Sequence, residues 1–462
     1  MMELVHFAPC VPGEGEPWDA KGAAAHFLRR TGFAAPTREI QTVFDKGLET
    51  AVANLFDESR DQEAEFQHIF DGIKGSFANF DDLAQLQAWW CYRMLKTRTP
   101  LREKLTLFWH GHFATSNHKV GDPVKVLRQI DTLRAHACGN FRDLVLAVSR
   151  DPAMLVYLDG EANTREHPNE NFARELLELF TLGIGNYSEK DVREAARAFT
   201  GWHHDGGKFV FHAEAHDDEE KQFLGRRGGF NGADIIDILM QHPALPRLIA
   251  RKLLVFFACP EPPEEVVHEA EQVFKQSGLN IKSFLSALFL SKFFYSPACR
   301  HTRISSPVEY VIGICRMLEV RFPAVQLPEH LTAMGQELFA PPNVKGWDGE
   351  KKWINATTLA ARAAFAIQLV EKYSENEFGP HLDLTRLVPD ELNQPKMIVD
   401  LLADRVLEGR LENNKRLDIA DFLITRNGMR QLDGFRNDGE FRGQQIRAAL
   451  ATMLSLPEFY AY

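Results

Sequence analysis

The chain has 462 residues, of which 45% are hydrophobic and 25% are charged, as in an ordinary globular protein. Its net charge of −11 at pH 7 excludes general nucleic-acid binding, which requires a basic surface. No stretch has the length and hydrophobicity of a membrane span, and residues 1–10 lack a basic segment followed by an apolar one. We therefore expect a cytoplasmic protein without a membrane span.

Hydrophobic residues at helical spacing recur along most of the chain and predict an all-α fold. Residues 57–80 and 374–394 are typical of loops. Residues 203–233, rich in His, Gly and Asp, form a long irregular segment in which 208–212 could be one short strand or hairpin. In chain order, the predicted helical regions are 18–57, 80–95, 100–108, 168–182, 188–200, 234–239, 243–257, 264–276, 281–294, 307–320, 355–373 and 397–462.

Two helices with clear boundary signals are predicted between His167 and Trp202. Gly183 ends the first helix, and Ser188 with Asp191 resembles a capping box at the start of the second. The short turn between them makes the helices antiparallel neighbours, so their charged faces could meet as a carboxylate–guanidinium network. The charged residues concerned are Glu170, Arg174, Glu175, Glu178, Arg193 and Arg197.

The carboxylates of this pair of helices are candidates for acid–base chemistry or metal ligation if they face a cleft. Glu175 and Glu178 have the spacing of half a carboxylate-bridged site in a helical bundle. The Glu-x-x-His partner of such a site occurs only at 65–68 and 265–268, in charged segments typical of solvated surface. In the alternative interpretation, arginines neutralise the carboxylates in a purely structural network.

Histidines form two further clusters. His110 and His112 could chelate one metal ion if the backbone there is extended, with His118 as a third imidazole. His216 and Asp217 lie in the irregular segment and could contribute to a Zn²⁺, Mn²⁺ or Fe²⁺ site. The alternatives are a helix end that covers the core for the first cluster and a solvated surface loop for the second.

A proline- and glycine-rich stretch, residues 339–358, carries Trp347 and Trp353 on a predicted rigid loop. With Asn343 nearby, the two indoles could form a stacking platform for sugar rings or other flat ligands. Equally, they could belong to a lid packed on the domain.

Several of these segments resemble one large bacterial family, catalogued as domain of unknown function 1800. The similar blocks are residues 98–116, the segment from Pro168 to Gly183, Ala-Arg-Ala-Phe-Thr-Gly-Trp at 196–202, residues 216–225 and Pro-Asn-Val-Lys-Gly-Trp at 342–347. The resemblance spans residues 18–460 and implies one architectural unit: a lead of residues 1–17, a helical lobe of 18–202, the irregular segment 203–233 and a helical lobe of 234–462. It implies no reaction.

Two features of the chain depart from the family. Many members resemble exported proteins with a signal segment, which this sequence lacks. Phe180 stands where some relatives carry His, so no metal or acid–base role transfers to that position.

These clusters predict a metal-assisted hydrolase whose polar cleft accepts a small polar or saccharide ligand, with a divalent metal that activates water. The expected metal ligands are His110, His112, His216 and Asp217. The expected acid–base residues are Glu170, Glu175 and Glu178, the anion-binding residues Arg174 and Arg197, and the substrate contacts Trp202, Trp347, Asn343 and Lys221. The alternative is a non-catalytic ligand-binding or assembly protein in which the polar cluster is structural. The oligomeric state stays open.

Overall fold

The computed structural model describes residues 5–10, 20–57, 82–373 and 378–461. Within these ranges helices dominate, and strands occur only in three two-stranded antiparallel sheets. The all-α prediction is therefore confirmed. The predicted loop at 58–80, the Glu-x-x-His pair at 65–68 and most of the N-terminal lead lie outside the described residues.

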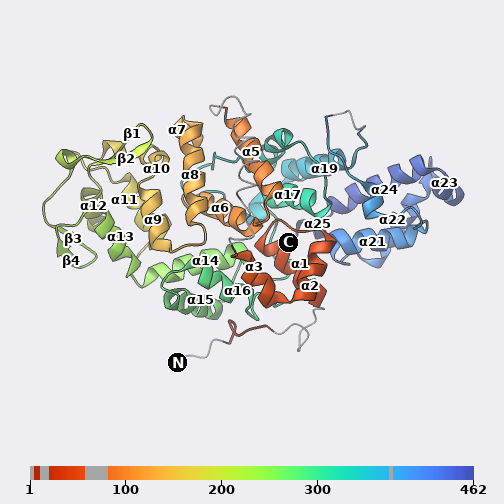
Figure 1. Ribbon diagram of the computed structural model, residues 1–462, viewed down its shortest axis with the longest axis horizontal. Coiled ribbons are helices and arrows are strands. Elements are labelled where there is room, and N and C mark those ends of the chain that lie inside the picture. The colour runs from red at the N-terminus through yellow and green to blue at the C-terminus, as the bar shows by residue number, and fades with distance from the viewer. Residues whose placement is uncertain (1–4, 11–19, 58–81, 374–377, 462) are drawn as a thin grey trace.

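The helices follow one another closely along the chain (Figure 1). The first part contains α1 (Ala20–Thr31), α2 (Thr37–Lys46), α3 (Leu48–Leu55), α5 (Leu83–Lys96), α6 (Pro100–His112), α7 (Asn117–Val120), α8 (Pro123–His136), α9 (Phe141–Ser149) and α10 (Pro152–Tyr157). The next part contains η2 (Gly160–Ala162), α11 (Asn171–Glu175), the π-helix η3 (Leu176–Thr181), α12 (Glu189–Ala198), η4 (Ala213–Ala215), α13 (Gly232–Met240), α14 (Ala244–Phe257), α15 (Glu264–Gln276) and α16 (Ile281–Phe289). The last part contains α17 (Pro307–Met317), η5 (Ala324–Gln326), α18 (Leu327–Ala333), η6 (Glu350–Trp353), α19 (Ala356–Val370), α20 (Leu384–Leu387), α21 (Pro395–Leu407), α22 (Asn413–Leu423), α23 (Leu432–Asn437), α24 (Gly439–Leu454) and α25 (Pro457–Tyr460).

Residues 203–233 contain two hairpins where the sequence indicated one at most. Strand β1 (Trp202–Asp205) pairs with β2 (Lys208–Phe211), with Trp202 opposite Phe211. Strand β3 (Lys221–Phe223) pairs with β4 (Arg226–Gly228). Strands this short carry too few residues for a readable alternation of apolar and polar positions, so the sequence pattern misses them. The third sheet joins β5 (Thr425–Arg426) and β6 (Met429–Arg430).

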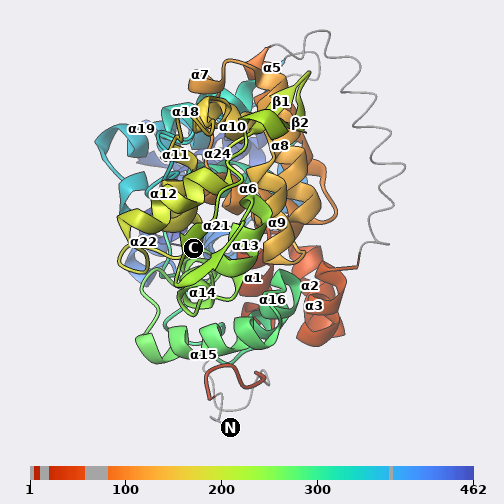
Figure 2. The ribbon, with the colours of Figure 1, turned by 90° about the vertical axis from the view of Figure 1, so that its left-hand side faces the viewer.

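The molecule is elongated, as Figure 1 shows, with the β1–β4 hairpins and α9–α13 at one end and α21–α24 at the other. Helices α5, α6 and α17 lie between the two ends, and Figure 2 looks along the long axis toward α11 and α12. The buried hydrophobic side chains form one continuous cluster that extends from Phe7 to Tyr460. None of the helices in the described ranges combines the length and the hydrophobicity that crossing a bilayer requires.

Helix α6 lies in the middle of this core, and its charged side chains are paired there. Glu103 is 1% exposed and accepts hydrogen bonds from Arg93 Nε at 2.6 Å and Arg134 Nε at 2.9 Å. The Trp90 indole also donates to Glu103, at 2.9 Å. Burial alone would raise the pKa of Glu103, but Arg134 and Arg93 outweigh it and lower the pKa to about 2. This carboxylate therefore joins α5, α6 and α8.

We expect Glu103→Gln to reduce the free energy of unfolding by about 3–5 kcal/mol, because it removes the buried negative charge that faces Arg93 and Arg134, and Arg134 then keeps only Asp131 as a counter-charge. Urea unfolding followed by circular dichroism measures the loss. Glu391→Gln, at an exposed position, is the control and should change stability by at most about 0.5 kcal/mol. Since the pKa of Glu103 is lowered from 4.5 to about 2, its stabilisation is complete above pH 4.5 and lost as the pH falls toward 2. Equal losses in both variants would contradict this role.

Candidate functional site

A π-helix lies where the sequence predicts a regular α-helix. Helix α11 ends at Glu175, and the chain continues as a π-helix from Leu176 to Thr181. The Thr181 hydroxyl donates to the Leu176 carbonyl at 2.5 Å. Such segments often mark functional sites, because the wider turn changes the direction of side chains and frees carbonyl groups.

Two side chains, the buried His112 and the half-buried Lys252, bind the carbonyl groups of the π-helix. His112 Nε2–H donates to the Phe180 carbonyl at 3.1 Å, and Lys252 donates to the Leu179 carbonyl at 2.9 Å. Lys252 also donates to His112 Nδ1, at 3.0 Å. Burial, followed by the Lys252 charge, holds the pKa of His112 well below its ordinary value, while burial lowers the pKa of Lys252 to about 8. His112 is therefore a neutral ring whose two nitrogens are both engaged within the protein.

His110 has a different environment from His112, although both belong to α6. Helix α6 continues through His112, so the prediction of an extended backbone at His110 and His112 is wrong. On a helix, residues i and i+2 point to different sides. His110 is fully buried and lies edge-on to Trp347, with ring centroids 5.4 Å apart. Neither of its ring nitrogens has a hydrogen-bond partner among the described residues. Burial lowers the pKa of His110 to about 3, so it stays neutral.

The loop that carries Trp347 packs directly on the end of α6. Gly346 has φ +81°, and a Cβ at this position would overlap the Gly111 carbonyl oxygen. The Asn343 side chain accepts a hydrogen bond from the Lys345 backbone N–H at 2.9 Å and closes the turn before this contact. Asn343 is thus a turn residue, and Trp347 stays half-buried beside His110.

Glu175 and Glu178, at the start of the π-helix, form the candidate functional site together with Tyr157, Tyr187 and Lys345. We call this group the carboxylate site. The Tyr187 hydroxyl donates to Glu178 at 3.1 Å, whereas half-buried Glu175 has no hydrogen bond to any described residue. Burial and then the Glu178 charge raise the pKa of Glu175, and Lys345 acts in the opposite direction. Burial and then Glu175 raise the pKa of Tyr157.

The other carboxylate predicted on this helix serves a surface ion network. Arg174 donates to both Glu189 oxygens, at 2.9 and 2.7 Å, and to Glu170 at 2.9 Å. This network joins α11 to α12 through Glu189, which was not among the residues of the predicted network. Glu170 and Glu189 therefore share the positive charge of Arg174.

A second network fastens the irregular segment to α12. Arg197 donates to both oxygens of Asp217, at 2.6 and 3.1 Å, and lowers the pKa of that carboxyl although burial would raise it. The buried Lys221 ammonium donates to the Asp217 and Glu219 carbonyl groups, at 2.5 and 3.0 Å. His216 Nδ1–H donates to the Thr200 carbonyl at 2.9 Å. These contacts give Arg197, Asp217 and Lys221 a structural role.

Two further predictions need correction. Trp202 is 5% exposed and packs edge-on against Phe199 and Phe209, so it lies in the core and presents no ligand surface. The four predicted metal ligands do not come together, since the described part of the chain contains no group of three or more His, Cys, Asp or Glu side chains that could hold a metal ion. The physical reason is that His110 and His112 belong to a buried helix, while His216 and Asp217 are held at α12.

The profile of one family, described as protein of unknown function (DUF1800), matches residues 26–461. The chain belongs to this family. No curated protein and no solved structure matches it. Three of the sequence blocks that resemble the DUF1800 family meet around the carboxylate site: the end of α6, the π-helix and the loop of Trp347.

Sequence reasoning missed three residues around this site of the DUF1800 chain. Tyr157 and Tyr187 carry no recognisable motif and reach the carboxylates only through the fold. Lys252 offered only a weak signal, because it is one of three cationic residues in α14, beside Arg247 and Arg251. A lysine in such a position has to find a buried partner, which here is His112.

We expect Gly346→Ala to detach the Trp347 loop, because a Cβ would displace the Gly111 backbone in addition to straining a residue at positive φ. Gly349→Ala is the matched control: its φ is +74°, and a Cβ there would meet only Trp353 Nε1 at 3.9 Å. Strain at positive φ costs about 1–2 kcal/mol in both variants, and overpacking adds about 1–3 kcal/mol in Gly346→Ala alone. Urea unfolding and the rate of tryptic cleavage at Lys345 measure the difference. Equal behaviour would show that the contact does not hold the loop.

Proposed function

We propose that the carboxylate site performs acid–base hydrolysis of a polar, carbohydrate-like substrate. Glu175 carries the proposal, because it is half-buried, has a raised pKa and makes no hydrogen bond to a described residue. A general acid must stay protonated near the working pH, and burial next to a second carboxylate is how proteins achieve this. Glu178 lies three residues further along the helix and supplies that second carboxylate.

The two carboxyl groups would have complementary tasks. Protonated Glu175 gives its proton to the leaving oxygen as the C–O bond breaks. The Glu178 side chain, as the general base, takes a proton from the water molecule whose oxygen forms the new C–O bond. The products are an alcohol and a hydrolysed fragment, and the net reaction consumes one water. The Tyr187 hydroxyl, whose pKa is raised to about 12, stays protonated and orients Glu178.

The surroundings support a polar substrate with an apolar face. Trp347 is half-buried beside His110, so part of its indole is available for stacking. Lys345 is exposed and its charge acts on Glu175, so its ammonium can donate hydrogen bonds to hydroxyl or anionic groups of a ligand bound there.

One observation separates this proposal from a non-catalytic binding protein. The binding interpretation expects every carboxylate of the cluster to be paired, and Glu170 and Asp217 are paired in this way. Glu175 is the exception, since Glu178, its near neighbour, disfavours its ionisation and the described residues offer it no hydrogen bond. A structural network gains nothing from such a group.

We expect Glu175→Gln to lower kcat/KM by about 10²- to 10⁴-fold, because an amide cannot transfer the proton. A panel of 4-methylumbelliferyl glycosides screened with the parent protein supplies the fluorogenic probe. Glu391→Gln, which removes an exposed carboxylate outside this site, is the control and should stay within about twofold of the parent. Unchanged hydrolysis by Glu175→Gln would refute the role of Glu175. A parent that binds but cleaves no glycoside would favour the binding protein.

The pH profile tests the same assignment through Lys345. Activity that needs protonated Glu175 falls as the pH rises through the pKa of this group. Lys345 lowers that pKa, so Lys345→Met should move the alkaline limb of kcat/KM to higher pH, whereas Lys351→Met at a nearby exposed position should leave it in place.

Glu178→Gln removes a charge that raises the pKa of Glu175, so the carboxyl titration of Glu175, followed by NMR, should shift to lower pH. Shifts of the opposite sign would contradict the assignment.

A further inference from the structure

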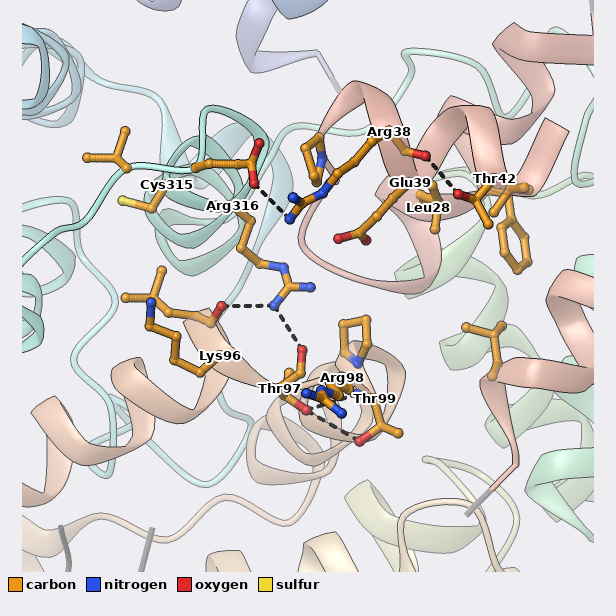
Figure 3. Close-up of a pocket in the computed structure, with 18 of the residues that line it drawn as sticks. Leu28, Arg38, Glu39, Thr42, Lys96, Thr97, Arg98, Thr99, Cys315 and Arg316 are labelled. Atoms are coloured by element: carbon orange, nitrogen blue, oxygen red, sulfur yellow. Dashed lines mark hydrogen bonds and ion pairs between the residues drawn. The ribbon is translucent and has the colours of Figure 1, made fainter. Parts of the chain in front are cut away.

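A cavity of about 1130 Å³ is lined by residues that do not belong to the carboxylate site. It is open to solvent and lies between α1, α2 and α3 on one side and the ends of α5 and α17 on the other (Figure 3). Ligand sites for small molecules usually measure about 300–1000 Å³, so this volume accommodates a sizeable organic molecule.

One part of the cavity wall is apolar. Phe27 and Leu28 of α1, Val43 of α2, Leu55 of α3 and Tyr92 of α5 contribute to the lining. Phe27 belongs to the buried core, so this wall is held by packing behind it. An apolar portion of a ligand would gain free energy by leaving water against this surface.

The rim of the cavity is basic. Seven Lys or Arg side chains line it, against the two carboxylates of Glu39 and Glu319. Among the cations, Lys46, Lys96, Arg98 and Arg321 form no ion pair with any described residue. Because the whole chain has a net charge of −11, this concentration of positive charge is local and does not follow from composition.

Two of the other cations on the rim, Arg38 and Arg316, are held by contacts within the protein. Arg38 binds Glu319 at 2.7 Å and so neutralises one of the two carboxylates. Arg316 extends toward the centre of the view in Figure 3, and its Nη1 donates to the carbonyl groups of Met94, Leu95 and Thr97 at 3.0–3.1 Å. These carbonyl groups lie at the C-terminal end of α5, where the helix dipole is negative. Arg316 therefore screens this negative end from an anion that enters the cavity.

The geometry points to a binding site for an organic phosphate with an apolar body, held by the unpaired cations at the rim and the apolar wall inside. Several separate cations suit a head group with more than one negative charge, since phosphate accepts several charge-assisted hydrogen bonds. The apolar wall selects against inorganic anions. This site is independent of the carboxylate site, because none of its lining residues belongs to that group.

Isothermal titration calorimetry with octyl phosphate tests the site. We expect one molecule to bind per chain, with a Kd that rises at least about tenfold in the double variant Lys96→Gln/Arg98→Gln and also rises with salt. Both residues are exposed, so the fold should persist, which circular dichroism verifies. Arg227→Gln, an exposed arginine on β4, is the matched control and should bind like the parent.

Comparison ligands separate the two parts of the site. Octyl glucoside shares the chain but not the charge, and inorganic phosphate shares the charge but not the chain. Both should bind at least about tenfold more weakly than octyl phosphate. Equal binding of either one, no binding of octyl phosphate, or no effect of the double variant would overturn the inference.

Co-sedimentation with lipid vesicles distinguishes a lipid head group from a free organic phosphate as the ligand. Co-sedimentation with phosphatidylglycerol vesicles, but not with phosphatidylcholine vesicles, and its loss in the double variant would identify a lipid head group as the ligand. Binding of octyl phosphate without co-sedimentation would identify a free organic phosphate. Both results support the shared chemistry. Co-sedimentation unaffected by the double variant would show that another surface binds the vesicles and would count against this cavity as a lipid site.

Discussion

The burial of helix α6 is the constraint on which the rest of the molecule depends. This helix carries Glu103 and Lys104 at fully buried positions, and an unpaired charge there would cost several kcal/mol, roughly 3–5 for a broken pair. Glu103 is paired with α5 and α8, while Lys104 binds Glu309 of α17 and the carbonyl groups at the end of α1. Pairing therefore fixes how four other helices lie around α6.

The carboxylate site inherits its geometry from the same helix. The end of α6 places Gly111 against the loop of Trp347 and His112 against the carbonyls of the π-helix. These two contacts bring together three segments that are well separated in the sequence, at 111–112, 180 and 346. The π-helix is stabilised by donors from outside itself, His112 and Lys252, which explains why an irregular helix persists at this position.

Charge is divided between two kinds of environment in this protein. At α12 the arginines and carboxylates neutralise one another in bidentate pairs that hold the irregular segment in place. At the carboxylate site and at the basic cavity, by contrast, Glu175 and cations such as Arg98 are left without such partners in the described structure. Charges that the fold does not neutralise are the ones available to a ligand, and both proposals rest on them.

The sequence by itself determined the local features of this protein. Helical periodicity predicted the helices, Ser188 and Asp191 predicted the capping box that begins α12, and proline and glycine predicted the loop of Trp347. Family resemblance singled out the segments that meet around the carboxylate site. These signals are readable because each depends on residues within a few positions of one another.

Tertiary structure alone decided the partners of those residues. Arg174 of α11 binds Glu189 of α12, and the pKa of Glu175 depends on its burial and on the distant residue Lys345. The helical continuation through His112 removed the predicted metal pair, and the basic cavity is assembled from four separate stretches between residues 27 and 386. Ionisation and ligand binding depend on distances across the fold, and a pattern of neighbours along the chain contains no information about those distances.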